Sequence, residues 1–359
     1  MDLKDLSDEF VQLTNLSITN LLQCMKSSGV KEQFIADIGP EKWNGIIQDM
    51  RNESTIIGMR DFHNWIKLVL ISNISKLVSN VSKGPIALLD IAVGRGGDLA
   101  KWNKSNIRFV FGFDKSEKSI SNTDEEDPGA LQRLSTFKGL RINNVHFEVG
   151  NALKPSKDLI NSIDLFLSKN KLKGFNIVSC QFALHYFFKT EIDLKIVLTL
   201  VSRNLNSGGY FIGTTTNGEI IKKIFKETKE KVYKTELFRI MRNFPKTIKN
   251  IYGNEYTFTI FDTKDRTNYF NTIGLSTEYL VDFKELERVA ATVGLVPVKL
   301  NLFEEYTLSK QKTFTEIKKN TIPFDDILKL GKWTPKSKDL TEEEKELNSL
   351  YTTFVFTKI

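Results

Sequence analysis

The stretch LLDIAVGRGGDLAKW, residues 88–102, decides the fold class of this 359-residue chain. It runs from an apolar segment into Gly94, Gly96 and Gly97, and then into a helix-like segment that begins near Asp98. In an open α/β sheet, the turn between a strand and the following helix binds ligands, because glycines let the backbone approach and the helix offers free amides. The stretch therefore predicts a ligand-binding turn at the carboxyl end of a parallel strand.

Apolar segments with helix-like connections continue on both sides of this turn. The predicted strands are IALLDIAV (86–93), RFVFGFD (108–114), VHFEVGN (145–151), FNIVSCQFA (175–183) and GYFIGTTT (209–216). A long helix is predicted before the first of them, ending at Lys83, Gly84 and Pro85. Strands that alternate with helices are typical of a doubly wound α/β fold, whose parallel sheet is buried on both faces.

The pattern changes after residue 217. A lysine-rich helix is predicted over 221–234, and its lysines either follow RNA phosphates or form a solvated face, which we favour. An antiparallel strand is predicted at EYTFTIFD (255–262), and another at the closing YTTFVFTKI (351–359). Earlier in the chain, TDEEDPGA (123–130) is predicted to be a surface loop insertion.

Composition limits the classes of partner. The net charge of +7 and pI near 9.0 favour a polyanionic partner such as nucleic acid. No apolar run is long enough to span a bilayer, and the acidic start does not resemble a secretory signal, so we expect a soluble intracellular protein without membrane contact. With two cysteines and three histidines, no zinc-ligand spacing can be written, and we expect no metal.

Asp114 ends the second predicted strand, twenty residues after Gly94. A carboxylate at this place accepts hydrogen bonds from both hydroxyls of a ribose, as in adenosine cofactors. A nicotinamide cofactor and S-adenosylmethionine (SAM) both contain adenosine. The dinucleotide pattern GxGxxG is absent, because Asp98 and Leu99 follow Gly97, and SAM has no phosphate to bind. The turn therefore favours a SAM-dependent methyltransferase.

Five motifs in order resemble those of the mRNA cap guanine-N7 methyltransferases, from about residue 56 to the C-terminus. They are MRDFHNWIK (59–67), DIAVGRGGDLAKW (90–102), CQFALHYFF (180–188), TEYLVDF (277–283) and LYTTFVFTK (350–358). The resemblance implies a Rossmann-like class I SAM-dependent methyltransferase fold, with a mostly parallel seven-stranded sheet and an antiparallel C-terminal strand. It also implies methyl transfer from SAM to N7 of the guanine cap of mRNA. The implied methyltransferase domain is 51–359, preceded by a helical N-terminal extension over 1–50.

The amino-acid sequences of these motifs most resemble those of the domain at the C-terminal end of multifunctional capping enzymes of large cytoplasmic DNA viruses. That resemblance implies fusion to triphosphatase and guanylyltransferase domains in a longer enzyme. The guanylyltransferase motif KxDG does not occur in this chain. Capped mRNA (GpppN) is the expected partner and a monomer the expected state, located in viral factories of the host cytoplasm and in the virion. A cellular relative would be nuclear.

The family's SAM contacts transfer to seven positions of this sequence. These are Lys67, Ala92, Gly94, Asp114, Asn151, Gln181 and Tyr186. The resemblance implies that Lys67 pairs with the SAM carboxylate, that Ala92 and Gly94 offer backbone to the methionine part, and that Asp114 binds the ribose. Asn151 stands beside adenine, where the family has aspartate.

The family's cap contacts transfer to eight positions. These are His63, Asn64, Arg95, Lys101, Arg133, His185, Glu278 and Tyr351. The resemblance assigns the arginines and Lys101 to the triphosphate bridge and places His63 where the family has asparagine. It assigns Glu278, His185 and Tyr186 as catalytic residues, which act by orientation and electrostatics without a general acid or base.

Three questions stay open in the sequence. Asp98 is either a carboxylate at a helix N-terminus or a clamp that orients Arg95. A methyltransferase that acts on another RNA position or on a protein is the nearest alternative function. A cap-binding subunit without catalytic activity is an alternative from another class.

Overall fold

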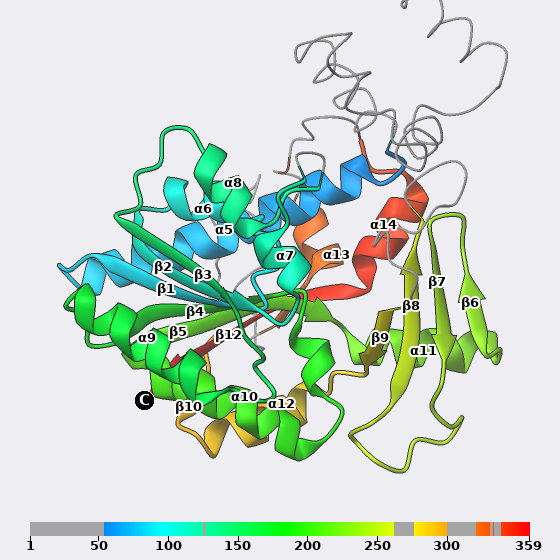
Figure 1. The fold of residues 1–359 in the computed structure, drawn as a ribbon. Coiled ribbons are helices and arrows are strands. Elements are labelled where there is room, and N and C mark those ends of the chain that lie inside the picture. Colours follow the sequence, from blue (N-terminus) through cyan, green and yellow to red (C-terminus); the bar gives the residue numbers. More distant parts are fainter. Residues whose placement is uncertain (1–53, 125–126, 262–275, 300–320, 331–332, 334–338) are drawn as a thin grey trace, which may run out of the picture.

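In the computed structural model, residues 54–124, 127–261, 276–299, 321–330, 333 and 339–359 are described (Figure 1). The predicted helical extension over residues 1–50 lies outside them. The described chain begins with helix α5 (Ile57–Val81) and then alternates strands and helices, as predicted. Among these residues, no helix is long and apolar enough to cross a membrane.

The central sheet has the order β10-β12-β5-β4-β1-β2-β3, with β11 paired to β12. Its strands are β1 (Ile86–Ile91), β2 (Ile107–Asp114), β3 (Asn144–Val149), β4 (Phe175–Gln181), β5 (Leu205–Thr216), β10 (Leu295–Pro297), β11 (Thr321–Pro323) and β12 (Tyr351–Lys358). The strands from β1 to β5 pair in parallel, whereas β12 is antiparallel to β5. The doubly wound sheet with an antiparallel C-terminal strand is therefore confirmed, and β11 joins the seven strands of the main path.

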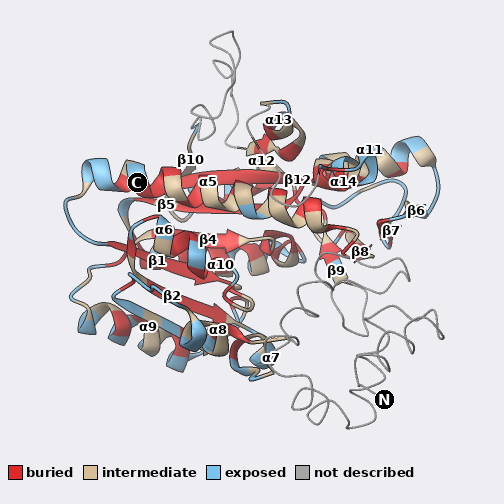
Figure 2. Cartoon of the chain, turned by 90° about the horizontal axis from the view of Figure 1, so that it is seen from above, coloured by how far each residue is buried: buried red, intermediate tan, exposed pale blue. Residues whose placement is uncertain are grey.

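Both faces of this sheet are covered. In β1, Ile86 and Leu88 belong to one apolar core and Ala87, Leu89 and Ile91 to the other, as the alternation of a strand requires. The first core lies under α5 and α6 (Leu99–Lys104), and the second under α9 (Lys157–Lys169), α10 (Glu191–Asn204) and α12 (Phe283–Ala291). Figure 2 shows the buried strands between partly exposed helices.

A second, antiparallel sheet lies beside α11 (Gly218–Thr228) in the order β6-β7-β8-β9 (Figure 1). Its strands are β6 (Val232–Lys234), β7 (Phe238–Arg242), β8 (Glu255–Ile260) and β9 (Ser276–Tyr279). Only β8 was predicted. The predicted helix over 221–234 was wrong at its end: Lys229 has a left-handed φ of 60°, and β6 follows. The lysine content of the segment does not indicate where the helix ends. The helix ends because the following residues pair as β6 with β7.

The remaining short elements connect the sheets to the edge that carries the site. They are α7 (Glu117–Ser121), α8 (Ala130–Thr136), η1 (Leu184–Phe187), α13 (Phe324–Leu328) and α14 (Glu342–Ser349). Glu344 of α14 accepts hydrogen bonds from the amides of Met59 (2.9 Å) and Thr341 (3.0 Å). Because the N-cap residue Ile56 has no capping side chain, this buried carboxylate fixes the helix that carries His63, Asn64 and Lys67.

Candidate active site

The glycine turn after β1 has an unusual backbone. Ala92, Gly94 and Gly96 have φ values of 59°, 55° and 66°, and for Ala92 this left-handed conformation is strained. A Cβ added to Gly94 would meet no atom within 4 Å, so open space adjoins the turn. The amide of Gly94 donates to Oδ2 of Asp114 (2.9 Å), and the amide of Ser116 donates to Oδ1 (2.9 Å). The carboxylate is held at the turn and keeps lone pairs for a diol.

A buried charge cluster lies next to this turn. Oδ1 of Asp98 is 2.6 Å from Nζ of Lys67 and 2.9 Å from Nζ of Lys101. Burial alone would raise the pKa of Asp98, but the two ammonium groups lower it to about 2. Asp98 makes no cap hydrogen bond to α6, and its charged partners are these lysines. The hypothesis that Asp98 clamps Arg95 is therefore wrong, and Asp98 instead joins the helix of Lys67 to the turn.

Lys101, predicted to contact the triphosphate, lies beside Asp98. Its side chain is buried, and Nζ also donates to the carbonyl oxygen of Gly97 (3.1 Å). A phosphate would have to displace Asp98 from this ammonium group within the protein interior. The triphosphate contact of Lys101 stays a prediction, and in this structure its ammonium group instead joins Asp98 to the turn.

The two arginines predicted for the triphosphate meet at one loop. The guanidinium of Arg95 binds the carboxylate of Asp127 through two nitrogens, with 2.7 Å between Nη2 and Oδ2. Nε of Arg133 donates to the carbonyl oxygen of Pro128 (3.2 Å). Both arginines thus contact the described end of the predicted insertion, at Asp127 and Pro128.

The other predicted SAM contacts lie at strand ends. The side chain of Gln181 accepts from Thr214 (3.1 Å) and donates to Ser179 (3.2 Å), which fixes its amide at the end of β4. Asn151 is exposed after β3, and its Oδ1 accepts from the amide of Leu153 (2.9 Å). Both residues therefore lie on the edge that carries the glycine turn, since β3 and β4 run parallel to β1.

Tyr186 lies between the two groups of predicted residues. Its hydroxyl is 3.0 Å from Oγ of Ser276, and Nζ of Lys115, next to Asp114, lies 5.8 Å from the centre of its ring. Burial and the nearby charge of Glu278 raise the pKa of Tyr186, so its hydroxyl stays protonated. Tyr186 therefore lies between Lys115, the neighbour of Asp114, and Ser276 of the second sheet.

The guanine candidates His185 and Glu278 face each other in the interior. Nε2 of His185 lies 3.7 Å from Oε1 of Glu278, beyond a hydrogen bond, and has no hydrogen-bond partner in the described part of the chain. Burial lowers the pKa of His185 to about 3, so the ring is neutral. Burial raises the pKa of Glu278 to about 7, although hydrogen bonds from Tyr256 (2.7 Å) and Ser276 (3.3 Å) lower it. An acceptor and an unsatisfied ring nitrogen are thus adjacent.

An aromatic cluster holds two of the remaining predicted cap residues, His63 and Tyr351. The ring of His63 stacks on Phe182 with 4.8 Å between the centres, and it meets Tyr351 and Phe324 edge to face. Burial lowers the pKa of His63 to about 3, so this ring is neutral too. Asn64, the next residue of α5, is exposed. The predicted pair is therefore divided, with His63 in the aromatic cluster and Asn64 at the surface.

Sequence reasoning missed four residues of this site: Phe182, Tyr256, Ser276 and Asp127. Phe182 follows Gln181 directly in the motif CQFALHYFF and has a left-handed φ of 54°, which turns the chain toward α5. Tyr256 is the residue of β8 directly opposite Glu278. Its pairing depends on the second sheet, of which the sequence predicted only β8.

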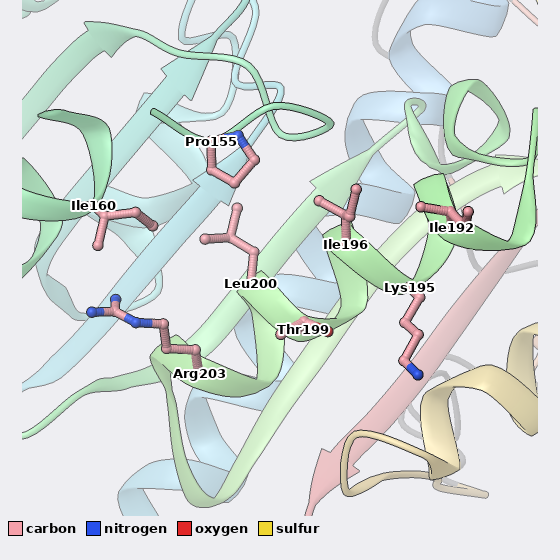
Figure 3. A pocket seen from close by; sticks show the side chains of 8 residues that line it. All are labelled: Pro155, Ile160, Ile192, Lys195, Ile196, Thr199, Leu200 and Arg203. Atoms are coloured by element: carbon pink, nitrogen blue, oxygen red, sulfur yellow. The ribbon is translucent and has the colours of Figure 1, made fainter. Parts of the chain in front are cut away.

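A separate cavity of about 320 Å³ opens between α9 and α10 (Figure 3). Its lining is mostly apolar and comprises Pro155, Ile160, Ile192, Lys195, Ile196, Thr199, Leu200 and Arg203. None of the predicted site residues lines it. In the described residues, no group of three or more His, Cys, Asp or Glu side chains is arranged to hold a metal ion.

Comparison of the sequence with family models and with curated proteins gives one family. Residues 29–359 match the mRNA (guanine-N(7))-methyltransferase domain. The mRNA cap guanine-N(7) methyltransferase of Schizosaccharomyces pombe is 28% identical over 312 residues, covering 86% of this chain and 77% of that protein. The mRNA cap guanine-N(7) methyltransferase 1 of Arabidopsis thaliana is 27% identical over 336 residues, covering 90% of this chain and 80% of that protein. A SAM-dependent methyltransferase structure from Clostridium acetobutylicum gives a TM-score of 0.45 at 11% identity, covering 81% of this chain and 91% of that one.

Proposed function

The chain belongs to the mRNA (guanine-N7)-methyltransferase family, and from this premise we propose that it methylates N7 of the guanine cap of mRNA with SAM as methyl donor. The observation that carries the assignment to these residues is the buried pair of His185 and Glu278, with 3.7 Å between Nε2 and Oε1. Tyr186 joins this pair to the turn that holds Asp114, so a donor site and an acceptor site share one edge of the fold.

The residues around the glycine turn fit SAM. Asp114 offers carboxylate oxygens to the ribose hydroxyls, and the open space beside Gly94 leaves room for the methionine part. Lys67, held at the turn by Asp98, supplies a positive charge for the SAM carboxylate. When bound, SAM supplies a methyl group on a positively charged sulfur. Asn151, Gln181 and the backbone of Ala92 complete the proposed contacts.

The guanine fits the buried pair. The carboxylate of Glu278 accepts hydrogen bonds from N1 and the exocyclic N2 of guanine, and neutral His185 donates to a base carbonyl through Nε2. N7 of guanine is unprotonated near neutral pH and already nucleophilic, so no general base is needed. Fixing N7 in line with the methyl group is an orientation effect that contributes at most roughly 7–11 kcal/mol.

Glu278 also acts electrostatically. The purine gains positive charge as N7 is methylated, and a carboxylate at its N1 and N2 edge stabilises that charge more than it stabilises the neutral base. Burial strengthens the effect, because few water molecules screen a carboxylate that is 3% exposed. We assign Tyr351, His63 and Phe182 to the cap side, and their ring contacts support this assignment. We assign Arg95 and Arg133 to the triphosphate, supported by their contacts at Asp127 and Pro128.

A transfer assay tests the proposal. The chain is incubated with methyl-labelled SAM and GpppA-capped RNA, and the digested RNA is analysed for 7-methylguanosine. Triphosphate-ended RNA and RNA already methylated at N7 are the control substrates, and neither should gain label. Label on the premethylated RNA or on the protein would support a methyltransferase with another substrate. Absence of SAM binding by calorimetry would support a cap-binding subunit without catalytic activity.

We also propose that this chain works as the methyltransferase domain of a capping enzyme from a large cytoplasmic DNA virus, fused to triphosphatase and guanylyltransferase domains. The amino-acid sequences of its five motifs support the proposal. Such an enzyme acts as a monomer in viral factories of the host cytoplasm. Mass spectrometry of the natural protein from infected cells tests it, and a free polypeptide of this length would contradict the fusion.

A further inference from the structure

Three cationic side chains converge on the loop after α7. Arg95 binds the Asp127 carboxylate through two nitrogens, and its Nη1 also donates to the Asp127 carbonyl oxygen (2.6 Å). Nζ of Lys118 lies 3.4 Å from Oδ2 of Asp127, and Arg133 donates to the carbonyl oxygen of Pro128. Arg95 of the glycine turn and Lys118 of α7 thus share one carboxylate, whereas Arg133 of α8 contacts the backbone beside it.

The contact between Arg95 and Asp127 has the geometry of phosphate recognition. A guanidinium binds either a carboxylate or a phosphate, and it uses the same pair of parallel N–H groups for both. The Arg95 and Asp127 side chains are 29% and 38% exposed, so an incoming anion can reach them. Pairs with this exposure are weak, because water screens both charges. A triphosphate carries several negative charges and can therefore replace a single carboxylate.

The backbone of the loop is anchored without the Asp127 side chain. The amide of Gly129 donates to the carbonyl oxygen of Asn122 (2.8 Å), and Nδ2 of Asn122 donates to the carbonyl oxygen of Asp127 (2.7 Å). A Cβ at Gly129 would lie 2.7 Å from the carbonyl oxygen of Ile120, which shows how closely the loop packs. Rotation of the Asp127 side chain therefore breaks both carboxylate contacts of Arg95 and leaves Nη1 on the Asp127 carbonyl oxygen, so Nη2 becomes available to an anion.

We infer that Asp127 is an internal competitor for the cap triphosphate: its carboxylate occupies Arg95 and Lys118 until the phosphates of the substrate replace it. The inference rests on the proposed cap-methylating function and adds Lys118 to the groups that face the triphosphate. Asp127 thereby sets the affinity for the polyphosphate bridge, and it lowers binding of weaker anions that cannot displace a carboxylate.

The test is Asp127→Asn, which keeps the shape of the side chain and removes its charge. The matched control is Asp164→Asn, because Asp164 forms a similar exposed pair with Arg203 (2.8 Å) on other elements. We expect Asp127→Asn to lower the KM for GpppA-capped RNA about three- to tenfold at unchanged kcat, with a similar gain in affinity for inorganic tripolyphosphate. The control should change neither value, and Arg95→Ala should abolish the gain.

A higher KM in Asp127→Asn would overturn the inference, since it would mean that Asp127 orients Arg95 for the substrate. An unchanged affinity for tripolyphosphate would overturn it as well. Calorimetry with tripolyphosphate requires no methyl transfer, so this arm decides the inference even if the proposed function fails. Thermal unfolding of both variants shows whether the loop keeps its fold.

Discussion

Tyr256 lies directly opposite Glu278 across β8 and β9, and its hydroxyl is 2.7 Å from Oε2 of the carboxylate. Oγ1 of Thr216, the last residue of β5, is 2.8 Å from the same hydroxyl. Ser276 continues the chain from Glu278 to Tyr186. The second sheet thus provides the carboxylate, whereas the central sheet and η1 fix its partners. One series of polar contacts therefore runs from Thr216 through Glu278 to Tyr186.

Tyr256→Phe should change the pH dependence of methylation. A hydrogen bond to the carboxylate form lowers the pKa of Glu278, and its loss should raise that pKa above about 7. Because only the carboxylate accepts both guanine donors, activity falls as pH falls through this pKa. We expect the acid limb of kcat/KM to move upward by about one pH unit. Steady-state rates from pH 5.5 to 9 measure it.

The control for this change is Tyr252→Phe. Tyr252 donates to Glu285 (2.6 Å), which lies on α12 and outside the proposed guanine contacts. Removal of this hydroxyl should leave the acid limb where it is. Equal shifts in both variants would mean that loss of packing, and not the bond to Glu278, causes the effect.

Glu278→Gln should stabilise the protein at alkaline pH and abolish cap methylation. Burial raises the pKa of Glu278 from 4.5 in the unfolded chain to about 7, so the folded state binds the proton more tightly. The resulting stability is complete below pH 4.5 and is lost as pH rises through 7. A neutral amide avoids the buried charge, and we expect a gain of about 1–3 kcal/mol in the free energy of unfolding at pH 8.

Urea unfolding of the wild type and Glu278→Gln at pH 5 and pH 8 tests this prediction. The difference between the two proteins should be much smaller at pH 5, where the wild-type carboxyl group is protonated in the folded state. Calorimetry should show that SAM binding is largely retained. A variant that is less stable at pH 8 would contradict a buried, energetically costly carboxylate.

Asp114→Ala should weaken SAM binding while the fold persists. The change removes the ribose acceptor and the partner of the Gly94 amide, so it affects both the ligand and the turn. We expect the Kd for SAM to rise about 10- to 100-fold, which corresponds to the loss of charge-assisted hydrogen bonds. Isothermal titration calorimetry measures it, with the exposed Asp158→Asn as control. Unchanged affinity would rule out the ribose role.

The parallel part of the central sheet was predicted from the sequence, because its local residue patterns and its topology agree. Strands β1 to β5 are apolar segments bounded by glycines and polar residues, and parallel pairing brings Gly94, Asp114 and Gln181 to one edge without further information. Of the second sheet, only β8 was predicted; β6 has three residues and β9 has four, too few to show a pattern. Such strands gain their stability from pairing partners that are distant in sequence.

Side-chain partners were harder to predict than positions. The turn predicted a charge at Asp98 but not which cation it would meet, and α5 supplies Lys67 from outside the strand and helix alternation. Likewise, an insertion that seemed incidental provides Asp127 as the partner of Arg95. Contacts of this kind depend on how separate elements pack, which no local pattern contains.

Asp98→Asn should destabilise the protein, because it leaves Lys67 and Lys101 without their carboxylate in a buried place. These side chains are only 14% and 10% exposed, and removal of one member of a buried ion pair costs about 3–5 kcal/mol. The lowered pKa of Asp98, about 2 against 3.8 in the unfolded chain, means that its contribution is present above pH 3.8 and is lost as pH falls through 2. Urea unfolding at pH 7 therefore measures the full effect.

A second substitution separates charge from packing. Lys101→Met removes one of the two ammonium groups and keeps a similar apolar stem, so Asp98→Asn combined with Lys101→Met leaves one unpaired charge instead of two. We expect the double variant to be more stable than the sum of the single losses predicts, by about 1–3 kcal/mol. Additive losses would mean that Asp98 stabilises the turn by its shape alone. SAM affinity should stay weakened in both Asp98 variants, since Lys67 no longer has the carboxylate that holds it at the turn.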